Sequence, residues 1–173
     1  YQMLKDYQIH ALVEFKKNAI IGSGWSIECP LDEDGNELTE YKEITDFISN
    51  NFKNEFDGSI EDAVLGILSA HDFGFSVSEK IYKVKNNKIL LSNISQLPPD
   101  SVEFEMDDYG ILTHLWQYST KGKIELTKDK YVIFSWNKID GNIWGESALR
   151  CVYKAWYIKD QVMKFWAMYL ERY

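Results

Sequence analysis

Apolar side chains recur at helical spacing in the first third of the chain. Residues 6–20, 40–55 and 60–72 repeat them every three or four positions, which is typical of helices with one buried face. In the first of these segments the predicted buried face carries Ile9, Leu12, Val13 and Ile20. Ser59 is expected to cap the third helix. A short strand is predicted at Trp25–Cys29, between the first two helices.

The spacing changes to alternation after Gly74, which predicts strands. Residues 75–91 are expected to form a hairpin that turns at Asn86-Asn87, because Asn tolerates the positive φ of tight turns. Beyond Pro98-Pro99, further strands are predicted at 102–106, 112–118 and 124–126, with His114 packed on the same side as Leu112 and Trp116. The continuous apolar run 131–134 is typical of a strand buried on both faces. Together these strands predict an antiparallel meander.

A long helix is predicted from Ser147 to Tyr173, a stretch without proline or glycine. It would measure about 40 Å at roughly 1.5 Å per residue. One predicted face is apolar, and it carries Val152, Trp156, Met163, Trp166 and Leu170. The opposite face carries Arg150, Lys154, Lys164 and Arg172. Lys159 falls on the apolar side, so its amine must snorkel to solvent or find a partner.

These elements predict an α+β fold with N-terminal helices, an antiparallel meander of short strands and a long C-terminal helix. We expect one domain over residues 1–173, with a mainly helical lobe at 1–73, a mainly β lobe at 74–140 and the long helix at 147–173. Because the helical period still runs at Tyr173 and the chain begins with Tyr1, we expect it to be a piece of a larger protein.

Charge is divided unevenly along the chain, whose net charge is −8. Residues 28–62 hold twelve acidic side chains and two lysines, whereas residues 121–173 hold ten basic and six acidic side chains. An acidic protein of this kind lacks the basic stripe of a general nucleic-acid binder. No apolar run approaches the roughly 18 residues of a membrane span, so no membrane association is expected. Cys29 and Cys151 are far apart, which favours a reducing compartment.

The strongest resemblance to a metal site is a loop that places Asp32, Asp34, Asn36 and Glu43 where a calcium loop has ligands. Glu37 stands where the sharp turn needs glycine, so a solvated loop is the favoured interpretation and no metal or cofactor is expected. The three histidines are scattered and lack a partner at metal-ligand spacing. No nucleophile, base and orienting group occur in a recognisable order, so the sequence predicts a protein that is not an enzyme.

Three blocks together resemble the portal proteins of tailed bacteriophages, in particular the Mu-like branch. They are Trp25–Ile27, Asp72–Glu79, and Trp144–Arg150 followed by Trp156, Lys159, Phe165-Trp166 and Tyr169–Arg172. The resemblance implies a homo-oligomeric ring, dodecameric in the full-length protein, at one capsid vertex of a phage or prophage virion. It further implies assembly in the host cytoplasm, roles in capsid assembly, DNA packaging and genome ejection, and contacts with capsid or scaffold proteins, head–tail connector proteins and the large terminase subunit. Double-stranded DNA would pass through the lumen without sequence specificity.

The basic face of the last helix gives the candidate subunit contacts, which are Arg150, Lys154, Lys164 and Arg172. An adjacent copy could meet this face with its acidic segment 28–62, although an ordinary solvated face is the simpler alternative. Glu79 is a further candidate, in an ion pair with Arg150 within the chain or between subunits. A different class of function stays open, namely a non-catalytic protein- or glycan-binding module that uses exposed aromatic residues such as Trp116 and Trp136.

Overall fold

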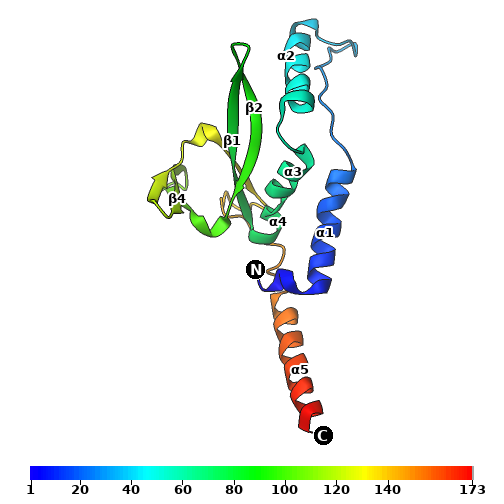
Figure 1. Cartoon of the computed structure of the whole chain (residues 1–173), viewed down its shortest axis with the longest axis vertical. Coiled ribbons are helices and arrows are strands. Elements are labelled where there is room, and N and C mark those ends of the chain that lie inside the picture. Colours follow the sequence, from blue (N-terminus) through cyan, green and yellow to red (C-terminus); the bar gives the residue numbers. More distant parts are fainter. Residues whose placement is uncertain (173) are drawn as a thin grey trace.

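The computed structural model describes residues 1–172 and has the predicted α+β class, with helices first, then antiparallel strands, then a helix (Figure 1). The helices are η1 Met3–Lys5, α1 Tyr7–Gly22, α2 Thr39–Asn50, the π-helix η2 Asn51–Glu55, α3 Ile60–Leu68, α4 Ala70–Phe73 and α5 Tyr153–Arg172. The strands are β1 Phe75–Lys85, β2 Lys88–Leu97, β3 Val102–Met106, β4 Leu112–Ser119, β5 Gly122–Glu125 and β6 Tyr131–Ser135. Two 3₁₀ turns, η3 Pro99–Ser101 and η4 Lys128–Lys130, connect strands.

The strands form two three-stranded sheets, in the orders β2-β1-β6 and β3-β4-β5. The predicted hairpin is confirmed, and its turn residues Asn86 and Asn87 have φ values of 52° and 58°. The predicted meander is confirmed for β3, β4 and β5. Strand β6 leaves the meander and pairs antiparallel with β1, from Phe75 opposite Ser135 to Glu79 opposite Tyr131.

The core lies where the two sheets meet, and its buried members are Val77, Leu97, Phe104, Leu115 and Leu126. Leu115 has no exposed surface and Val77 has 1%. Phe75 packs edge-on against Phe104 with 5.1 Å between ring centroids, which ties the β1 sheet to the β3 sheet.

Two predictions about the strands are wrong. The pairing register shifts between Glu105 and Met106, and this β-bulge lets both Leu112 and Leu115 face the core. His114 is therefore turned to the outer face with Trp116 instead of packing inside. Strand β6 is an edge strand and is only half-buried, so the prediction of burial on both faces also fails.

The predicted helices are present with altered limits. Ser59 caps α3 by accepting the amide of Asp62, as predicted, but the segment 60–72 is split at Ser69 into α3 and α4. The last helix begins at Tyr153 rather than Ser147, because residues 148–152 form successive turns. Residues 25–29 run without a strand partner, so the predicted strand is wrong.

The buried stripe of α1 also differs from the prediction. Val13 and Lys17 are the buried residues of this helix, whereas Leu12 is 64% exposed. A helical wheel that counts only apolar residues misplaces the buried face of α1, because the charged residue Lys17 belongs to that face.

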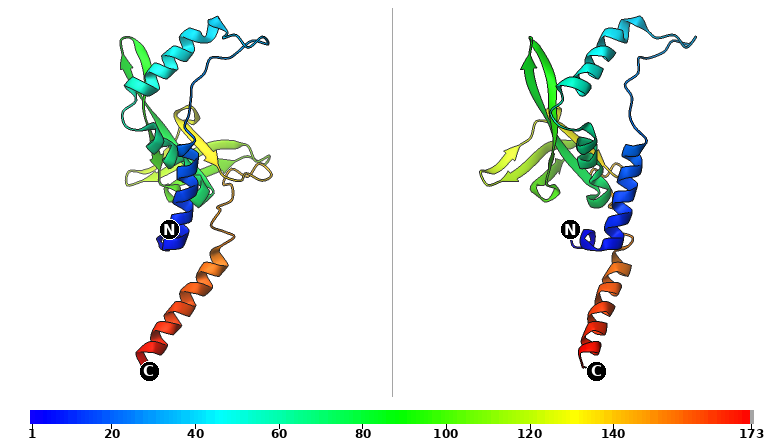
Figure 2. Two further views of the ribbon diagram at one scale, coloured as in Figure 1. Left: turned by 90° about the vertical axis from the view of Figure 1, so that its right-hand side faces the viewer. Right: turned by 45° about the vertical axis from the view of Figure 1, so that its right-hand side comes forward.

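The molecule is elongated, with α5 projecting from one end of the body (Figure 1). The two further views agree that α5 extends away from both sheets and that α2 and the β1–β2 hairpin tip lie toward the other end (Figure 2). None of the residues of α5 up to Arg172 is buried.

The π-helix η2 covers the outer edge of β2 next to the β-bulge between Ile81 and Tyr82. The Asn51 side-chain amide donates to the Leu91 carbonyl and accepts the Leu91 amide, each over 2.9 Å. The Asp57 amide adds a bond of 2.7 Å to the Ser92 carbonyl. These bonds satisfy backbone groups that an edge strand would otherwise leave unpaired.

We expect Asn51→Ala to lower the free energy of unfolding by about 1–3 kcal/mol, because it leaves the Leu91 amide and carbonyl without partners. Chemical denaturation followed by circular dichroism measures the change. Asn54→Ala is the matched control, since the Asn54 side chain donates a hydrogen bond to the exposed side chain of Asn50, one helical turn earlier, and not to β2. Equal effects of the two substitutions would contradict the role assigned to Asn51.

Candidate assembly surface

A close backbone contact joins the end of α4 to the segment that leads into α5. The Trp136 amide donates to the Gly74 carbonyl over 2.7 Å, and the Glu146 amide donates to the Trp136 carbonyl over 2.9 Å. Gly74 and Gly145 face each other there with φ values of 95° and 58°. A Cβ atom on Gly145 would collide with the carbonyl oxygens of Gly74 and Trp136. We call this contact the glycine joint, comprising residues 72–74, 136 and 144–147.

A second pair of bonds strengthens the glycine joint. The Ser147 hydroxyl donates to the Asp72 main-chain carbonyl over 2.5 Å, and the Ala148 amide donates to the His71 carbonyl over 2.9 Å. Because these bonds hold residues 147 and 148 on the end of α4, they fix the point from which α5 departs.

A buried ion pair supports the joint from the side of α1. The Lys17 amine lies 2.5 Å from one carboxylate oxygen of Asp72, and their side chains are 11% and 4% exposed. The other oxygen of Asp72 lies 3.2 Å from Nδ1 of His71, whose ring packs edge-on against Trp136. Sequence reasoning missed Lys17. Its position four residues after Val13, on the buried stripe, is the signal that could have found it.

Lys159 ties the base of α5 to the start of α1. Its amine lies 2.7 Å from a carboxylate oxygen of Asp6 and 3.0 Å from the amide oxygen of Gln8, and it sits over the ring of Tyr7. Asp6 is also the N-cap of α1, accepting the amides of Gln8 and Ile9. Of the two predicted alternatives for Lys159, snorkelling or pairing, the structure shows an ion pair with Asp6.

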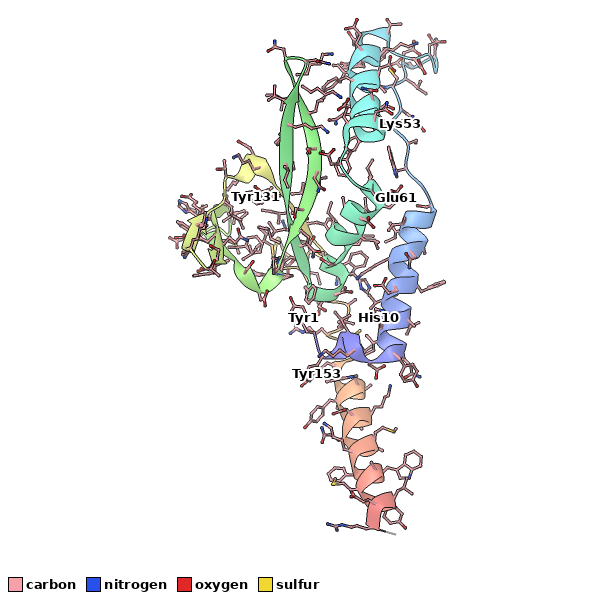
Figure 3. The ribbon with its side chains drawn as sticks, viewed as in Figure 1. Tyr1, His10, Lys53, Glu61, Tyr131 and Tyr153 are labelled. Atoms are coloured by element: carbon pink, nitrogen blue, oxygen red, sulfur yellow. The ribbon has the colours of Figure 1, made fainter. Side chains whose placement is uncertain are left out.

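Beyond its base, α5 presents large apolar side chains to solvent. They include Ile158, Val162, Met163, Phe165, Trp166, Met168 and Leu170, each about half exposed or more. Tyr153 at the start of α5 lies near Tyr1, where the helix leaves the body (Figure 3). Exposed apolar area of this extent is typical of a surface that another protein covers.

An open groove lies between the N-terminal segment, the glycine joint and the first turns of α5. Two of the candidate subunit-contact residues, Arg150 and Lys164, line it together with Glu146 and Asp160. Arg150 lies 3.9 Å from Glu146, and Lys164 lies 2.6 Å from Asp160. The groove therefore carries both signs of charge, and each base has an acid of the same chain beside it.

The other candidates lie apart. Lys154 and Arg172 are exposed on α5, whereas Glu79 is on β1 in the body. The pKa of Tyr131 is raised by burial, by the charge of Glu79 and by a hydrogen bond with the Glu79 side chain. In the part of the chain that the structure describes, Arg150 pairs with Glu146 and not with Glu79.

Part of the acidic segment 28–62 is neutralised within the chain. Lysines of the β1–β2 hairpin reach it, with Lys83 lying 3.0 Å from Asp57 and Lys85 lying 2.7 Å from Glu55. Hydrogen bonds from Ser92 and Lys83 lower the pKa of Asp57. The acids of α2, such as Glu40 and Glu43, lie on the exposed surface.

The loop that resembles a calcium site uses its first carboxylate for its own backbone. Asp32 accepts the amides of Asp34 and Asn36 over 3.0 and 2.8 Å, and these bonds lower its pKa. Within residues 1–172, no three His, Cys, Asp or Glu side chains are grouped as metal ligands would be.

Among the helices described, none is long and apolar enough to cross a membrane. Cys29 and Cys151 are free thiols.

The structure is thus a mixed α+β body from which a helix with exposed apolar side chains projects. A family model described as the portal protein of Mu bacteriophage matches residues 1–173, so the chain belongs to that family. This family is a structural, non-enzymatic family of bacteriophage proteins. No curated protein matches the chain.

Asp72→Asn is expected to cost about 3 kcal/mol of unfolding free energy, because the Lys17 amine loses its buried counter-charge at 2.5 Å and keeps only the more exposed carboxylate of Glu14 at 3.6 Å. Replacing both partners, as Lys17→Met with Asp72→Asn, is expected to recover most of that loss. Denaturant unfolding of Asp72→Asn, of Lys17→Met, of the double variant and of the parent measures the coupling. Asp108→Asn, in an exposed turn, is the control; a coupling near zero would show that the pair does not support the joint.

The hydrogen bond from Lys159 is the main cause that lowers the pKa of Asp6 below its ordinary 3.8. A carboxyl whose pKa is lowered by folding stabilises the folded state above its unfolded pKa and loses that effect as the pH falls through its folded pKa. The contact between α5 and α1 should therefore open below about pH 3.8. Lys159→Met should return the Asp6 pKa toward that ordinary value in a carbon NMR titration, whereas Lys164→Met should not. If the pKa of Asp6 is unchanged in the Lys159→Met variant, the contact between Lys159 and Asp6 is refuted.

Proposed function

We propose that the chain is a subunit of a homo-oligomeric portal ring at a capsid vertex, through which double-stranded DNA enters and leaves. The observation that carries this proposal is α5, a helix that projects from the body with apolar side chains uncovered along its length. Family membership supports the same conclusion. A surface of this kind is stable in water only when another protein buries it, and further copies of the chain are the partner that a ring supplies.

The charge of the chain suits a conduit for DNA. Its net charge of −8 gives it no general affinity for phosphate, so a duplex would pass along it without adhering. Glu40 and Glu43 of α2 are exposed and are not paired with the hairpin lysines Lys83 and Lys85, so they give this part of the surface a negative charge that repels phosphate. Contacts with the large terminase subunit, with capsid or scaffold proteins and with head–tail connector proteins belong to the same proposal, and the resemblance in sequence supports them.

A contact between basic α5 and the acidic segment of an adjacent copy stays a prediction. The two surfaces lie toward opposite ends of the molecule, so this contact joins copies end to end (Figures 1 and 2). Copies that stand side by side around an axis bring α5 next to α5 instead.

The aromatic residues do not favour the alternative of a glycan- or peptide-binding module. The Trp116 indole donates to Glu105 over 2.8 Å, lies beside the His114 ring and has the Lys123 amine 4.6 Å from its centroid. Trp136 packs on His71 at the joint. Neither ring offers an open flat face of the kind that a sugar stacks on.

Size measurement tests the proposal. The purified protein should form closed assemblies larger than dimers in mass photometry, and negative-stain images should show rings with a central hole. Raising the salt concentration should weaken assembly only modestly, because apolar contacts carry it. A protein that stays monomeric at all concentrations would overturn the proposal.

A further inference from the structure

The segment that joins α1 to α2 begins as an extended stretch without a strand partner. We call residues 25–29 the strap. Within the part of the chain that the structure describes, no backbone hydrogen bond joins the strap to another segment. The strap passes outside the body, between the end of α1 and the loop before α2 (Figures 1 and 2). Its backbone amides and carbonyls therefore form an open edge, which is the kind of edge that pairs with a further strand.

The side chains of the strap alternate between the body and solvent. Ile27 and Cys29 are half-buried, whereas Ser26 and Glu28 are exposed. Trp25 lies on the side of Ile27, since both side chains line the same cavity. This period of two is that of a β-strand with one face on the body.

An apolar cavity of about 290 Å³ separates the strap from η2, α3 and β2. The residues that line it are all apolar, and they include Trp25, Ile27, Phe52, Ile60, Val64 and Ile94. Trp25 packs edge-on against Phe52 and is 45% exposed, so the cavity reaches the surface beside the strap. An apolar cavity of about 150 Å³ accommodates benzene. The cavity under the strap thus has room for an aromatic or branched apolar side chain.

A second cavity, of about 450 Å³, follows the first along the strap, and Ile27 lines both. Its charged lining residues are Glu28, Glu37, Asp46 and Lys42. Lys42 lies 3.9 Å from Glu37, so three carboxylates share one amine. This excess of negative charge is complementary to a basic side chain.

We propose that the strap binds an extended segment of another protein, which pairs with the strap as an added strand, places an apolar side chain in the first cavity and places a lysine or arginine in the second. In this mode of recognition main-chain hydrogen bonds supply affinity, and pockets for alternate side chains supply specificity. The site is separate from Trp116 and Trp136, whose rings are engaged within the chain. It goes beyond the proposed ring and does not depend on it.

A second copy of the chain fits the strap less well than a different protein does. Pairing of two straps would bring Glu28 of both copies to one contact, and like charges on paired strands are destabilising. The strands β1 to β6 are already members of the two sheets, so none of them is free to be donated. A basic extended segment from a different protein meets neither objection.

Two synthetic peptides are the probes for this site. Both are rich in threonine, which favours the extended conformation. One carries a phenylalanine followed by lysines at alternate residues, and the other carries these residues in reverse order, so the pair covers both strand directions. Fluorescence polarisation should show saturable binding of one labelled peptide to the full chain.

Filling the apolar cavity tests the first half of the site. Val64→Phe should weaken peptide binding by at least about tenfold, because the phenylalanine of the peptide can no longer be buried. Val84→Phe makes the same change on the β1–β2 hairpin, where Val84 is 76% exposed, and should leave binding unchanged. Thermal melting followed by circular dichroism checks that both variants are folded.

Neutralising the acidic cavity tests the second half and leaves α3 unaltered. Glu37→Gln combined with Asp46→Asn should weaken peptide binding by about threefold to tenfold, as expected for two exposed ion pairs. Glu33→Gln combined with Glu40→Gln removes the same net charge from exposed positions outside the cavity, so it should have the smaller effect. Equal effects of the two double variants would show that no basic side chain enters the cavity.

Methylation of the peptide's own amides tests strand pairing. Only alternate amides of a strand face one neighbour. Methylation at one alternating set of residues should therefore abolish binding, whereas methylation at the other set should preserve it. The same result with both sets would contradict pairing with the strap.

The remaining outcomes separate this inference from the proposed ring. A parent that forms rings and binds neither peptide overturns the inference alone. Binding that neither Val64→Phe nor the acidic-cavity variant weakens places the peptide elsewhere and also overturns it. If an unlabelled peptide dissociates the parent's assemblies in sedimentation velocity, the strap is occupied by a second copy and the choice of partner is wrong. A parent that binds a peptide and stays monomeric overturns only the ring.

Discussion

The position of every element beyond residue 136 depends on two backbone segments that approach more closely than any side chain permits. Gly74 and Gly145 both have positive φ, and a Cβ on either would collide with a carbonyl oxygen of the opposite segment or of Trp136. The amides of Trp136 and Glu146 close the contact. Because this joint holds the chain at the end of α4, α5 leaves the body at a fixed place, and the Lys159 contact with Asp6 then sets its direction.

The body buries few of its apolar residues and leaves many of them exposed to solvent. Its buried cluster contains only Val77, Leu97, Phe104, Leu115 and Leu126, supported by partly buried neighbours. The helices α1, α2 and α5 all expose large apolar side chains. Burial on this scale is weak for a chain of 173 residues, so the isolated chain leaves much apolar surface in contact with water.

Local signals in the sequence predicted most elements, and long-range contacts account for the failures. Asn86-Asn87 and Ser59 specify their turn and cap through their own backbone, so both were predictable. His114 was placed wrongly because a bulge in β3–β4 pairing reverses the facing of that strand, and no local pattern encodes the bulge. Lys17 was overlooked because its partner Asp72 is 55 residues away. Arg150 and Lys164 each have an acid of their own chain four residues earlier, Glu146 and Asp160, and this spacing was a local signal that the prediction of subunit contacts did not use.

The blocks that carry the resemblance to portal proteins are largely the blocks that build this joint. Asp72 and Gly74 come from one block, and Gly145 and Ser147 come from another, and they meet through backbone bonds rather than through any reactive group. Glycine and serine at these positions allow the close backbone contact that fixes where α5 leaves the body. The residues of these blocks act through backbone contacts that position α5. This explains how a chain without a recognisable catalytic arrangement can still carry a specific pattern of residues.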